Sequence, residues 1–553
     1  MRVTRLLVAG LLASTVSCDS LDVTNPNNPS RVTVEQNAQD ALALISNGLL
    51  QWFNRSGGTS PAVALSVMAD EFTTGFADFG GQDLSSEPRL AINIQSPNNG
   101  PPHHVTFPDY YSHIAALNTA LRAADRGLVL RNSAGQDVTT AAVAFAKFMQ
   151  GLNHGYVALM FDKGYVYSET VDPDTLRFSD GATGVQDLIR PYREVMDTAL
   201  AELNAALTLA KSTAFSYPAS PSNAWFLGVL RDSDDMARII HSYMARLMVY
   251  VARTPQERQD VDWEAVIDHI DQGITSDFVV MGEVDRVFSL FKQRGARLRT
   301  TIPGDFMRVD YRLIGPGDVT QSFISWYTLP WSERNPFRMV GTPDKRIQGA
   351  TTRPDTCIPL TIPDADCGLY MGFHNSTLFS AARGTGQRSF YFFHRYGSGI
   401  SWQSGPLVLV NVAEMDLLKA EGLIRLGRAD EAVPLINKYR VANGDLPPVD
   451  VDGVPATAPD CVPRKLDGSC GSLWDALRYE KRVETLGLEG GPAYYDGRAW
   501  NFLVENTPVH FPIPLRDLEL LSINPYTFGG VGGADGAPAP DPERCPVALL
   551  RCP

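Results

Sequence analysis

The sequence predicts a mainly α-helical protein, in which helical hairpins form a scaffold that carries one long irregular segment. Three observations support this fold class. From 34 to 277, apolar residues recur every three or four positions, the spacing of amphipathic helices. From 278 to 405 this spacing fades, and Gly, Pro and aromatic residues alternate with short strand-like runs. The helical spacing returns within 406–553.

The composition is that of an ordinary globular protein. The 553 residues are 44% hydrophobic and 20% charged, which argues against disordered, collagen-like and multispan membrane classes. The length predicts two to four domains or one large helical unit. There are 62 acidic side chains against 48 basic ones, and the net charge is −14. The chain therefore lacks the basic footprint that nucleic-acid binders usually show.

The N-terminus has the pattern of an export signal. Arg2 and Arg5 precede the apolar run Leu6–Val16, which is too short to span about 30 Å of hydrocarbon as a helix. The run ends just before Cys18 in a pattern that resembles a bacterial lipobox. We expect residues 1–17 to be a signal peptide and 18–33, which are polar and rich in Asn and Pro, to be a lipid-anchored tether. The alternative is an ordinary cleaved signal with a chance cysteine.

The other six cysteines fall in three close pairs within loop-like sequence. The pairs are Cys357 with Cys367, Cys461 with Cys470, and Cys545 with Cys552. Local disulfides are the simplest prediction in an exported chain, although the sequence does not determine the connectivity. A zinc site usually needs two to four residues between paired cysteines, and these gaps are wider.

The amphipathic spacing predicts a series of helices in the first half of the chain. They are expected over 110–128, 144–160, 185–207, 235–252 and 263–273. The helix at 144–160 is apolar on most sides and is therefore expected to be buried. Pro191 falls inside the third helix, which should start or kink there.

The irregular segment contains the candidate ligand-binding residues. Sugar recognition needs flat aromatic faces together with polar groups for the hydroxyls. The candidates are Trp326, Tyr327, Trp331 and Trp402, with Asn335 and Arg395 as polar partners. A large aromatic residue more often packs in a core than it carries a ligand, and this alternative stays open. The run 390–393 is predicted to be a core strand.

Helical spacing resumes at 407–443 and again at 473–488. Within the first stretch, 412–441 has the small residues and the central Gly427 of a tetratricopeptide-like hairpin, since glycine readily adopts the positive φ that ends a helix. One such hairpin cannot bury its own face, so the N-terminal helix pairs are expected to be its partners. An ordinary hairpin in a helical bundle is the alternative. The residues after 524 are rich in Gly and Pro and are expected to cover the surface without much regular structure.

Standard catalytic and cofactor-binding strings are missing from the sequence. Neither a metal site nor a cofactor is predicted. The adjacent His103 and His104 are expected to be solvated loop residues, and Asp450 to Gly453 a simple turn. One charged set could pass for an active site but is predicted to be an ion-pair and hydrogen-bond network. Its members are Glu480, Arg482, Glu484, Asp496 and Arg498.

Several of these features coincide in order along the chain and resemble one family. The matching residues are Cys18 to Asp22 with Asn25-Pro26; Tyr110-Tyr111 with Ile114 and Asn118; Ala413 to Met415, Lys419 to Glu421 and Ile436 to Arg440; Glu480 to Glu484, Glu489-Gly490 and Asp496 to Arg498; and Phe511 to Pro514 with Glu519 and Asn524-Pro525. They are similar to the SusD/RagB-like outer-membrane nutrient-binding lipoproteins.

This resemblance implies a scaffold of four tetratricopeptide-like hairpins and an irregular remainder that recognises the ligand. It further implies a non-catalytic lipoprotein on the outer membrane, facing the cell exterior. Such a protein would capture an oligosaccharide or another oligomeric nutrient for a SusC-like, TonB-dependent transporter. Two alternatives remain from the residues alone: a surface glycoside hydrolase, which needs only two suitably placed carboxyl groups, and a helical scaffold that binds proteins.

Overall fold

The computed structural model describes most of the chain between residues 35 and 526. The described residues are 35–54, 61–74, 81–85, 103–173, 176, 184–219, 225–282, 298–299, 302–303, 307–330, 333–334, 341–347, 366–373, 389–396, 405–456, 461–504, 507–524 and 526.

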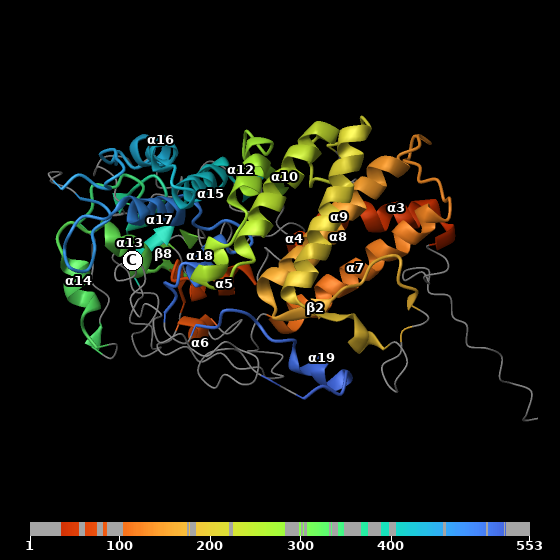
Figure 1. Ribbon diagram of the computed structural model, residues 1–553, viewed down its shortest axis with the longest axis horizontal. Helices are drawn as coiled ribbons and strands as arrows, with labels where there is room; N and C mark the ends of the chain where they lie inside the picture. Colours follow the sequence, from red (N-terminus) through yellow and green to blue (C-terminus); the bar gives the residue numbers. More distant parts are fainter. Residues whose placement is uncertain are drawn as a thin grey trace, which may run out of the picture.

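A row of helices forms the body of the described structure (Figure 1). The row consists of α7 (His103–Asp125), α8 (Thr139–Met160), α9 (Tyr192–Ser212), α10 (Ser233–Tyr250), α12 (Trp263–Asp271), α15 (Val412–Arg425) and α16 (Ala429–Ala442). Each helix of the row packs against the one that follows it. The arrangement confirms the mainly α-helical fold class with paired helices that the sequence predicts. The row begins at His103, so His103 and His104 lie in the first turn of a helix rather than in the loop expected for them.

The second helix of the row, α8, is buried between its neighbours, as its apolar sequence predicts. Nearly all of its residues from Ala144 onward are buried. Two glycines let the neighbouring helices approach. A Cβ atom at Gly151 would lie 2.6 Å from Cγ of Leu203 on α9, and one at Gly155 would lie 2.7 Å from Cδ1 of Leu247 on α10. A larger residue at either position would force the helices apart.

The proline inside the predicted helix 185–207 sets the start of α9. Pro191 is the N-cap residue, because its ring fixes φ and it has no N–H to donate within a helix. The residues before it form a short 3₁₀ turn (Val185–Leu188) and strand β3 (Ile189–Pro191). This strand pairs antiparallel with β2 (Lys163–Tyr165).

The hairpin predicted at 412–441 is present as α15 and α16. Gly427 has a φ of +76°. The N–H of Gly427 donates to the carbonyl of Ile424, and the N–H of Arg428 donates to the carbonyl of Leu423. This is the Schellman pattern, which satisfies the last carbonyls of a helix and reverses the chain.

The prediction that this helical region begins at Leu407 is wrong. Residues Gly405–Val410 form strand β13, which pairs antiparallel with β6 (Phe278–Gly282). Leu407 and Leu409 are buried, whereas Pro406 between strand residues is exposed. Alternation of this kind has the period of two that belongs to a strand. The run is apolar enough to continue the helical spacing of α15, so the sequence pattern does not separate the two.

The described part of 278–405 contains short helices and strands, in agreement with the predicted irregular segment. After β6 at its start, its elements are β7 (Leu298–Arg299), β8 (Ile302–Pro303), β9 (Arg308–Val309), α13 (Tyr311–Ile314), a 3₁₀ turn (Gly315–Gly317), α14 (Ser322–Tyr327), β10 (Asp366–Cys367), β11 (Met371–Phe373) and β12 (Tyr391–Phe393). The last three form an antiparallel sheet with β11 in the middle. All three residues of β12 are buried, which confirms the core strand.

Two further helices follow the hairpin. Helix α17 (Leu473–Glu484) starts at Ser472, whose hydroxyl and backbone form a capping box with Asp475. Helix α18 is Pro492–Ala499. The remaining elements are α3 (Ala38–Ser46), α4 (Gly48–Phe53), α5 (Ala62–Met68), α6 (Gly81–Ser85), α11 (Pro255–Gln259), α19 (Leu515–Leu520), β1 (Phe72–Thr73), β4 (Ser216–Tyr217) and β5 (Arg231–Asp232).

Cys461 and Cys470 form the disulfide predicted for them. The other two predicted pairs are not tested: Cys367 lies in β10, and Cys357, Cys545 and Cys552 lie outside the described residues. Asp450 to Gly453 form a turn, in which the N–H of Gly453 donates to the carbonyl of Asp450. None of the described helices combines the length and apolar character needed to cross a membrane.

Candidate functional site

Four of the last five side chains of α17 are ionisable and buried: Glu480, Lys481, Arg482 and Glu484. Consecutive residues of a helix are turned by about 100° from one another, so the first three point in three directions. Glu484 lies one turn beyond Glu480 on the same side of the helix. A buried charge is costly unless it is paired and hydrogen-bonded, so each of these groups needs partners. We call these four residues and their partners the α17 charge network.

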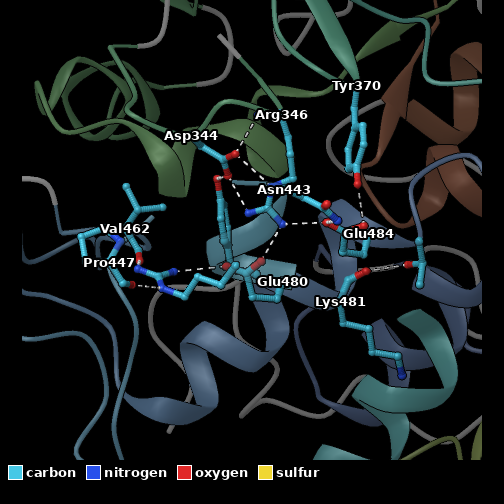
Figure 2. Close-up of polar contacts among 12 residues, drawn as sticks. Asp344, Arg346, Tyr370, Asn443, Pro447, Val462, Glu480, Lys481 and Glu484 are labelled. Carbon is cyan, nitrogen blue, oxygen red and sulfur yellow. Dashed lines mark hydrogen bonds and ion pairs between the residues drawn. The ribbon is translucent and has the colours of Figure 1, made fainter. Parts of the chain in front are cut away.

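Glu480 joins the hairpin to the irregular segment (Figure 2). Its two carboxylate oxygens accept from Arg346 at 2.5 Å and from Arg440 of α16 at 3.1 Å. The guanidinium of Arg346 also donates to both oxygens of Asp344, at 2.9 and 2.7 Å. The hydroxyl of Tyr479 donates to Asp344 as well, at 2.7 Å. Two arginines from different parts of the chain are thereby fixed by one carboxylate.

Glu484 extends the same link toward the three-stranded sheet (Figure 2). It accepts from Arg346 at 3.0 Å, from the hydroxyl of Tyr370 at 2.8 Å and from Asn443 at 3.1 Å. Arg395, which follows β12, donates to the Glu484 side chain at 3.2 Å and lies 3.9 Å from the centre of the Tyr370 ring. Glu484 therefore binds a residue just before β11 and a residue just after β12.

Lys481 and Asp496 continue the network toward α11 and α15. Lys481 donates to Asp496 at 2.9 Å, and Arg258 donates to the same carboxylate at 2.7 Å. Arg258 also donates two hydrogen bonds to the carboxylate of Glu421 of α15, at 2.9 and 2.7 Å, which makes a bidentate ion pair. Burial alone would raise the pKa of Glu421, but the charge and hydrogen bonds of Arg258 outweigh burial and hold that pKa well below its usual range.

The buried arginines also satisfy backbone carbonyls at the ends of helices. Arg498 donates to the carbonyls of Leu159 near the end of α8 and Tyr250 at the end of α10, each at 2.8 Å. Arg482 donates to the carbonyl of Ala69, the C-cap of α5, at 2.7 Å. The last carbonyls of a helix have no partner within the helix and carry partial negative charge. A buried guanidinium supplies several donors and a positive charge at that point.

The charged set predicted as a structural network is thus confirmed as a set of ion pairs and hydrogen bonds. Sequence reasoning missed several of its partners, among them Asp344, Arg258 and Glu421. Glu421 lies among the apolar residues of α15, which is a sequence signal for a buried and paired carboxylate. The structure shows that it is fully buried. Its partner Arg258 is 163 residues away in sequence, which no local pattern reveals.

The structure places the predicted ligand-binding residues in different surroundings. Trp326 and Tyr327 are 6% and 5% exposed and pack against Phe323 within α14, and Trp326 also packs on Tyr311. Both rings therefore pack in the core, which is the alternative that the sequence left open for them. Arg395 is partly exposed and adjoins the α17 charge network. Trp331, Asn335, Trp402 and Cys18 lie outside the described residues.

Glu71 lies beside the network, and none of the described basic residues hydrogen-bonds to it. One of its oxygens accepts from the hydroxyl of Ser66 at 2.7 Å, and the other has no hydrogen-bond partner among the residues that the structure describes. The side chain is 1% exposed. Burial raises the pKa of Glu71 to about 7, although the hydrogen bond from Ser66 and the charge of Arg482 act in the opposite direction.

Within the described ranges, no three carboxylate, imidazole or thiol side chains gather as a metal site.

We expect Arg346→Met to lower the free energy of unfolding by about 3–5 kcal/mol, because it leaves Asp344, Glu480 and Glu484 buried without their shared partner. Urea unfolding followed by circular dichroism measures this change. The control is Arg428→Met, which removes an exposed pair with Glu431 and should leave the unfolding midpoint unchanged. Equal effects of the two substitutions would contradict the network's role.

We expect the wild-type protein to lose stability between about pH 4.5 and 7 relative to Glu71→Gln. The folded protein keeps a proton on Glu71 that the unfolded chain releases above its ordinary pKa, so stability falls as pH rises through this window. Above pH 8, the wild type should have lost about 3 kcal/mol of unfolding free energy that the variant keeps, since one pKa unit corresponds to about 1.4 kcal/mol. Urea unfolding of both proteins at pH 5 and pH 8 tests this. A difference that does not change with pH would show that Glu71 titrates normally.

Comparisons with known proteins identify the fold through structure rather than sequence. No family model matches the chain, and no curated protein matches it in sequence. Solved structures do match. A SusD superfamily protein from Bacteroides vulgatus has a TM-score of 0.51 and 10% identity, over 88% of this chain and 97% of the other. A SusD superfamily protein from Bacteroides thetaiotaomicron has a TM-score of 0.51 and 15% identity, over 88% and 96%.

A third solved structure is a SusD-like carbohydrate-binding protein from Bacteroides fragilis. It has a TM-score of 0.51 and 14% identity, over 85% of this chain and 88% of the other. At such low identity, the similarity shows a shared fold and no more. It extends over nearly the whole length of all three proteins, in agreement with the family that the sequence motifs suggest. The chain therefore has the fold of the SusD superfamily.

Proposed function

We propose that the protein is a nutrient-binding lipoprotein that captures an oligosaccharide and delivers it to a TonB-dependent transporter. The observation that carries this proposal is the fold, which the chain shares with SusD superfamily proteins over 88% of its length. One protein with this fold is a carbohydrate-binding protein. The sequence motifs that resemble SusD/RagB-like lipoproteins are independent support.

The ligand site in this proposal lies in the irregular segment, beside Arg395. This residue is held by Glu484 and Tyr370, so a ligand there would meet a side chain whose position is already set. Trp402 follows Arg395 in sequence and precedes β13, which is anchored on β6. Trp402, Trp331 and Asn335 are proposed as the aromatic and polar contacts. Trp326 and Tyr327 are left out because their rings are buried.

The carboxylates that could pass for a catalytic pair are engaged in structure. Glu480, Glu484 and Asp496 are at most 1% exposed, and each is paired with arginine or lysine. A glycosidase needs one carboxyl group that gives a proton and one that meets sugar or water. These three groups are closed to a sugar. These three groups are therefore not the carboxyl pair that a surface glycoside hydrolase would need.

The N-terminal pattern supports the proposed anchor, and the resemblance to SusD/RagB-like lipoproteins supports the proposed partner. Cys18 is proposed to carry lipid after cleavage of residues 1–17, and 18–33 to separate the fold from the membrane. Such an anchor would hold the protein on the outer membrane, on the exterior side, next to the transporter that receives the nutrient.

We expect the mature protein to bind at least one oligosaccharide of a plant and microbial glycan panel without cleaving it. Trp402→Ala should weaken that binding about tenfold, equivalent to about 1.4 kcal/mol of lost stacking. Isothermal titration measures the affinity, and chromatography of the recovered sugar tests for turnover. The matched control is Trp326→Phe, which alters a buried ring and should leave the affinity unchanged. Unaltered binding in Trp402→Ala would exclude this site, and turnover would exclude the non-catalytic proposal.

We expect the mature lipidated protein, purified in detergent from the outer membrane of the cells that naturally produce it, to co-purify with a TonB-dependent transporter. Mass spectrometry should find lipid on Cys18. The Cys18→Ala variant has no lipid anchor, so it should be absent from the outer-membrane fraction and should no longer co-purify with the transporter. Purification of the lipidated wild type without any transporter would contradict the proposed partnership.

A further inference from the structure

A cleft of about 290 Å³ lies where α3 and α4 meet the first half of α7. One wall consists of residues from the α3–α4 side: Ala43, Leu44, Asn47 and Gln51. The other wall consists of residues from α7: Asp109, Ser112, His113 and Ala116. Helices α3 and α7 lie at one end of the helical row, and α17 lies at the other (Figure 1). The α7 cleft, as we call it, is therefore separate from the region around Arg395 that is proposed to meet the nutrient.

Helical spacing brings the lining residues of each wall to one face. The four residues from α7 are three or four positions apart, so they form one stripe along that helix. Ala43, Asn47 and Gln51 are four positions apart, although the chain passes from α3 to α4 at Asn47. The N–H of Gln51 donates to the carbonyl of Asn47 at 3.0 Å, so the stripe continues across this junction. The small side chains of Ala43 and Ala116 leave space between the two stripes.

Four of the lining side chains carry oxygen atoms that can accept a hydrogen bond. Asp109 contributes a carboxylate. Nδ2 of Asn47 donates to the carbonyl of Ala43 at 2.8 Å, which leaves the amide oxygen of Asn47 without a partner among the described residues. The side chains of Gln51 and Ser112 are exposed and make no hydrogen bond with any residue that the structure describes. A ligand in the cleft can therefore meet several acceptors that the protein itself does not use.

The charges around the cleft favour a cation. The eight lining residues that the structure describes include one carboxylate, that of Asp109, and neither lysine nor arginine. Asp40 of α3 adds a second negative charge one helical turn before Leu44. The whole chain carries a net charge of −14. An anion would be repelled from this cleft, and a cation would be attracted to it.

We propose that the α7 cleft binds a primary ammonium group on a short alkyl stem, as in an aliphatic amine or a lysine side chain. An ammonium group has three N–H donors and no acceptor, which matches a set of acceptor oxygens around one carboxylate. The alkyl stem would contact Leu44 and Ala116. His113 is 7% exposed and forms the floor, and Oδ1 of Asn153 on α8 holds its ring at 3.1 Å from Nδ1.

Other classes of ligand fit this lining less well. A sugar ring usually packs on a flat aromatic face, and no Trp, Tyr or Phe is among the described lining residues. Calcium takes about six to eight oxygen ligands, several of them carboxylates, and one carboxylate falls short of that need. The proposed ammonium site is independent of the oligosaccharide and goes beyond the proposed function.

The test is a saturation-transfer NMR titration of the mature protein with pentylamine at pH 7, with 1-pentanol as the uncharged ligand of equal chain length. We expect pentylamine to bind in the millimolar range and pentanol to bind at least about tenfold more weakly, because it lacks the charge-assisted hydrogen bonds. Asp109→Asn should weaken pentylamine binding at least about tenfold, and Gln51→Leu about threefold. The matched control is Asp197→Asn, which removes an exposed carboxylate of α9 and should leave the affinity unchanged.

The variant Gln51→Leu changes an exposed side chain, so it is expected to fold even if Asp109→Asn does not. Lysine amide acetylated at its α-nitrogen is titrated in parallel. Binding of pentylamine alone would indicate a free amine as the ligand, binding of the lysine derivative alone a lysine of a protein, and binding of both any primary ammonium group.

Four results would overturn the proposal: binding of neither amine, equal affinity for pentylamine and pentanol, equal effects of Asp109→Asn and Asp197→Asn, and unchanged binding in Gln51→Leu. Oligosaccharide binding is measured separately, so failure of the ammonium site and failure of the proposed function are distinguishable.

Discussion

Arg346 and Arg440 both donate to Glu480 in a space closed to water, and this shared carboxylate joins the irregular segment to the C-terminal hairpin. Removal of two such charges from water costs several kcal/mol, and only well-placed partners offset that cost. The positions of Asp344, Glu480 and Glu484 therefore determine one another. Lys481 meets the same requirement through Asp496, and Arg482 through backbone carbonyls.

The same buried side chains connect charge to helix geometry. Arg498 and Arg482 reach carbonyls near the ends of three helices that are far apart in sequence. A helix end that is buried without such donors is destabilising, because its last carbonyls lose water and gain nothing. Each guanidinium thus fixes where a helix stops relative to its neighbours. Through Tyr370, Glu484 also holds Arg395, the described residue at the edge of the region proposed to meet the ligand.

Local patterns predicted the elements better than the site. The helices of the first half, the hairpin around Gly427 and the strand at 390–393 were predicted because periodicity and turn chemistry are properties of neighbouring residues. The strand at β13 was missed because its partner β6 is far away in sequence. Trp326 and Tyr327 were candidates for the ligand site, with core packing as the alternative, and a short helix places them against Phe323. Whether an aromatic ring is core or platform depends on what covers it, and the sequence does not show that.

The sequence by itself determined the helical class, the place of the irregular segment, the hairpin and the structural character of the charged set at 480–498. These follow from spacing, from glycine at one turn and from charges too numerous in one helix to be left unpaired. Only the tertiary structure decided which arginine meets which carboxylate, as with Arg258 and Glu421 across 163 residues. It also brought Asn47 and Asp109 to one cleft. Such pairs are set by the packing of helices, because burial makes a charge or a polar group depend on whichever residue the fold places beside it.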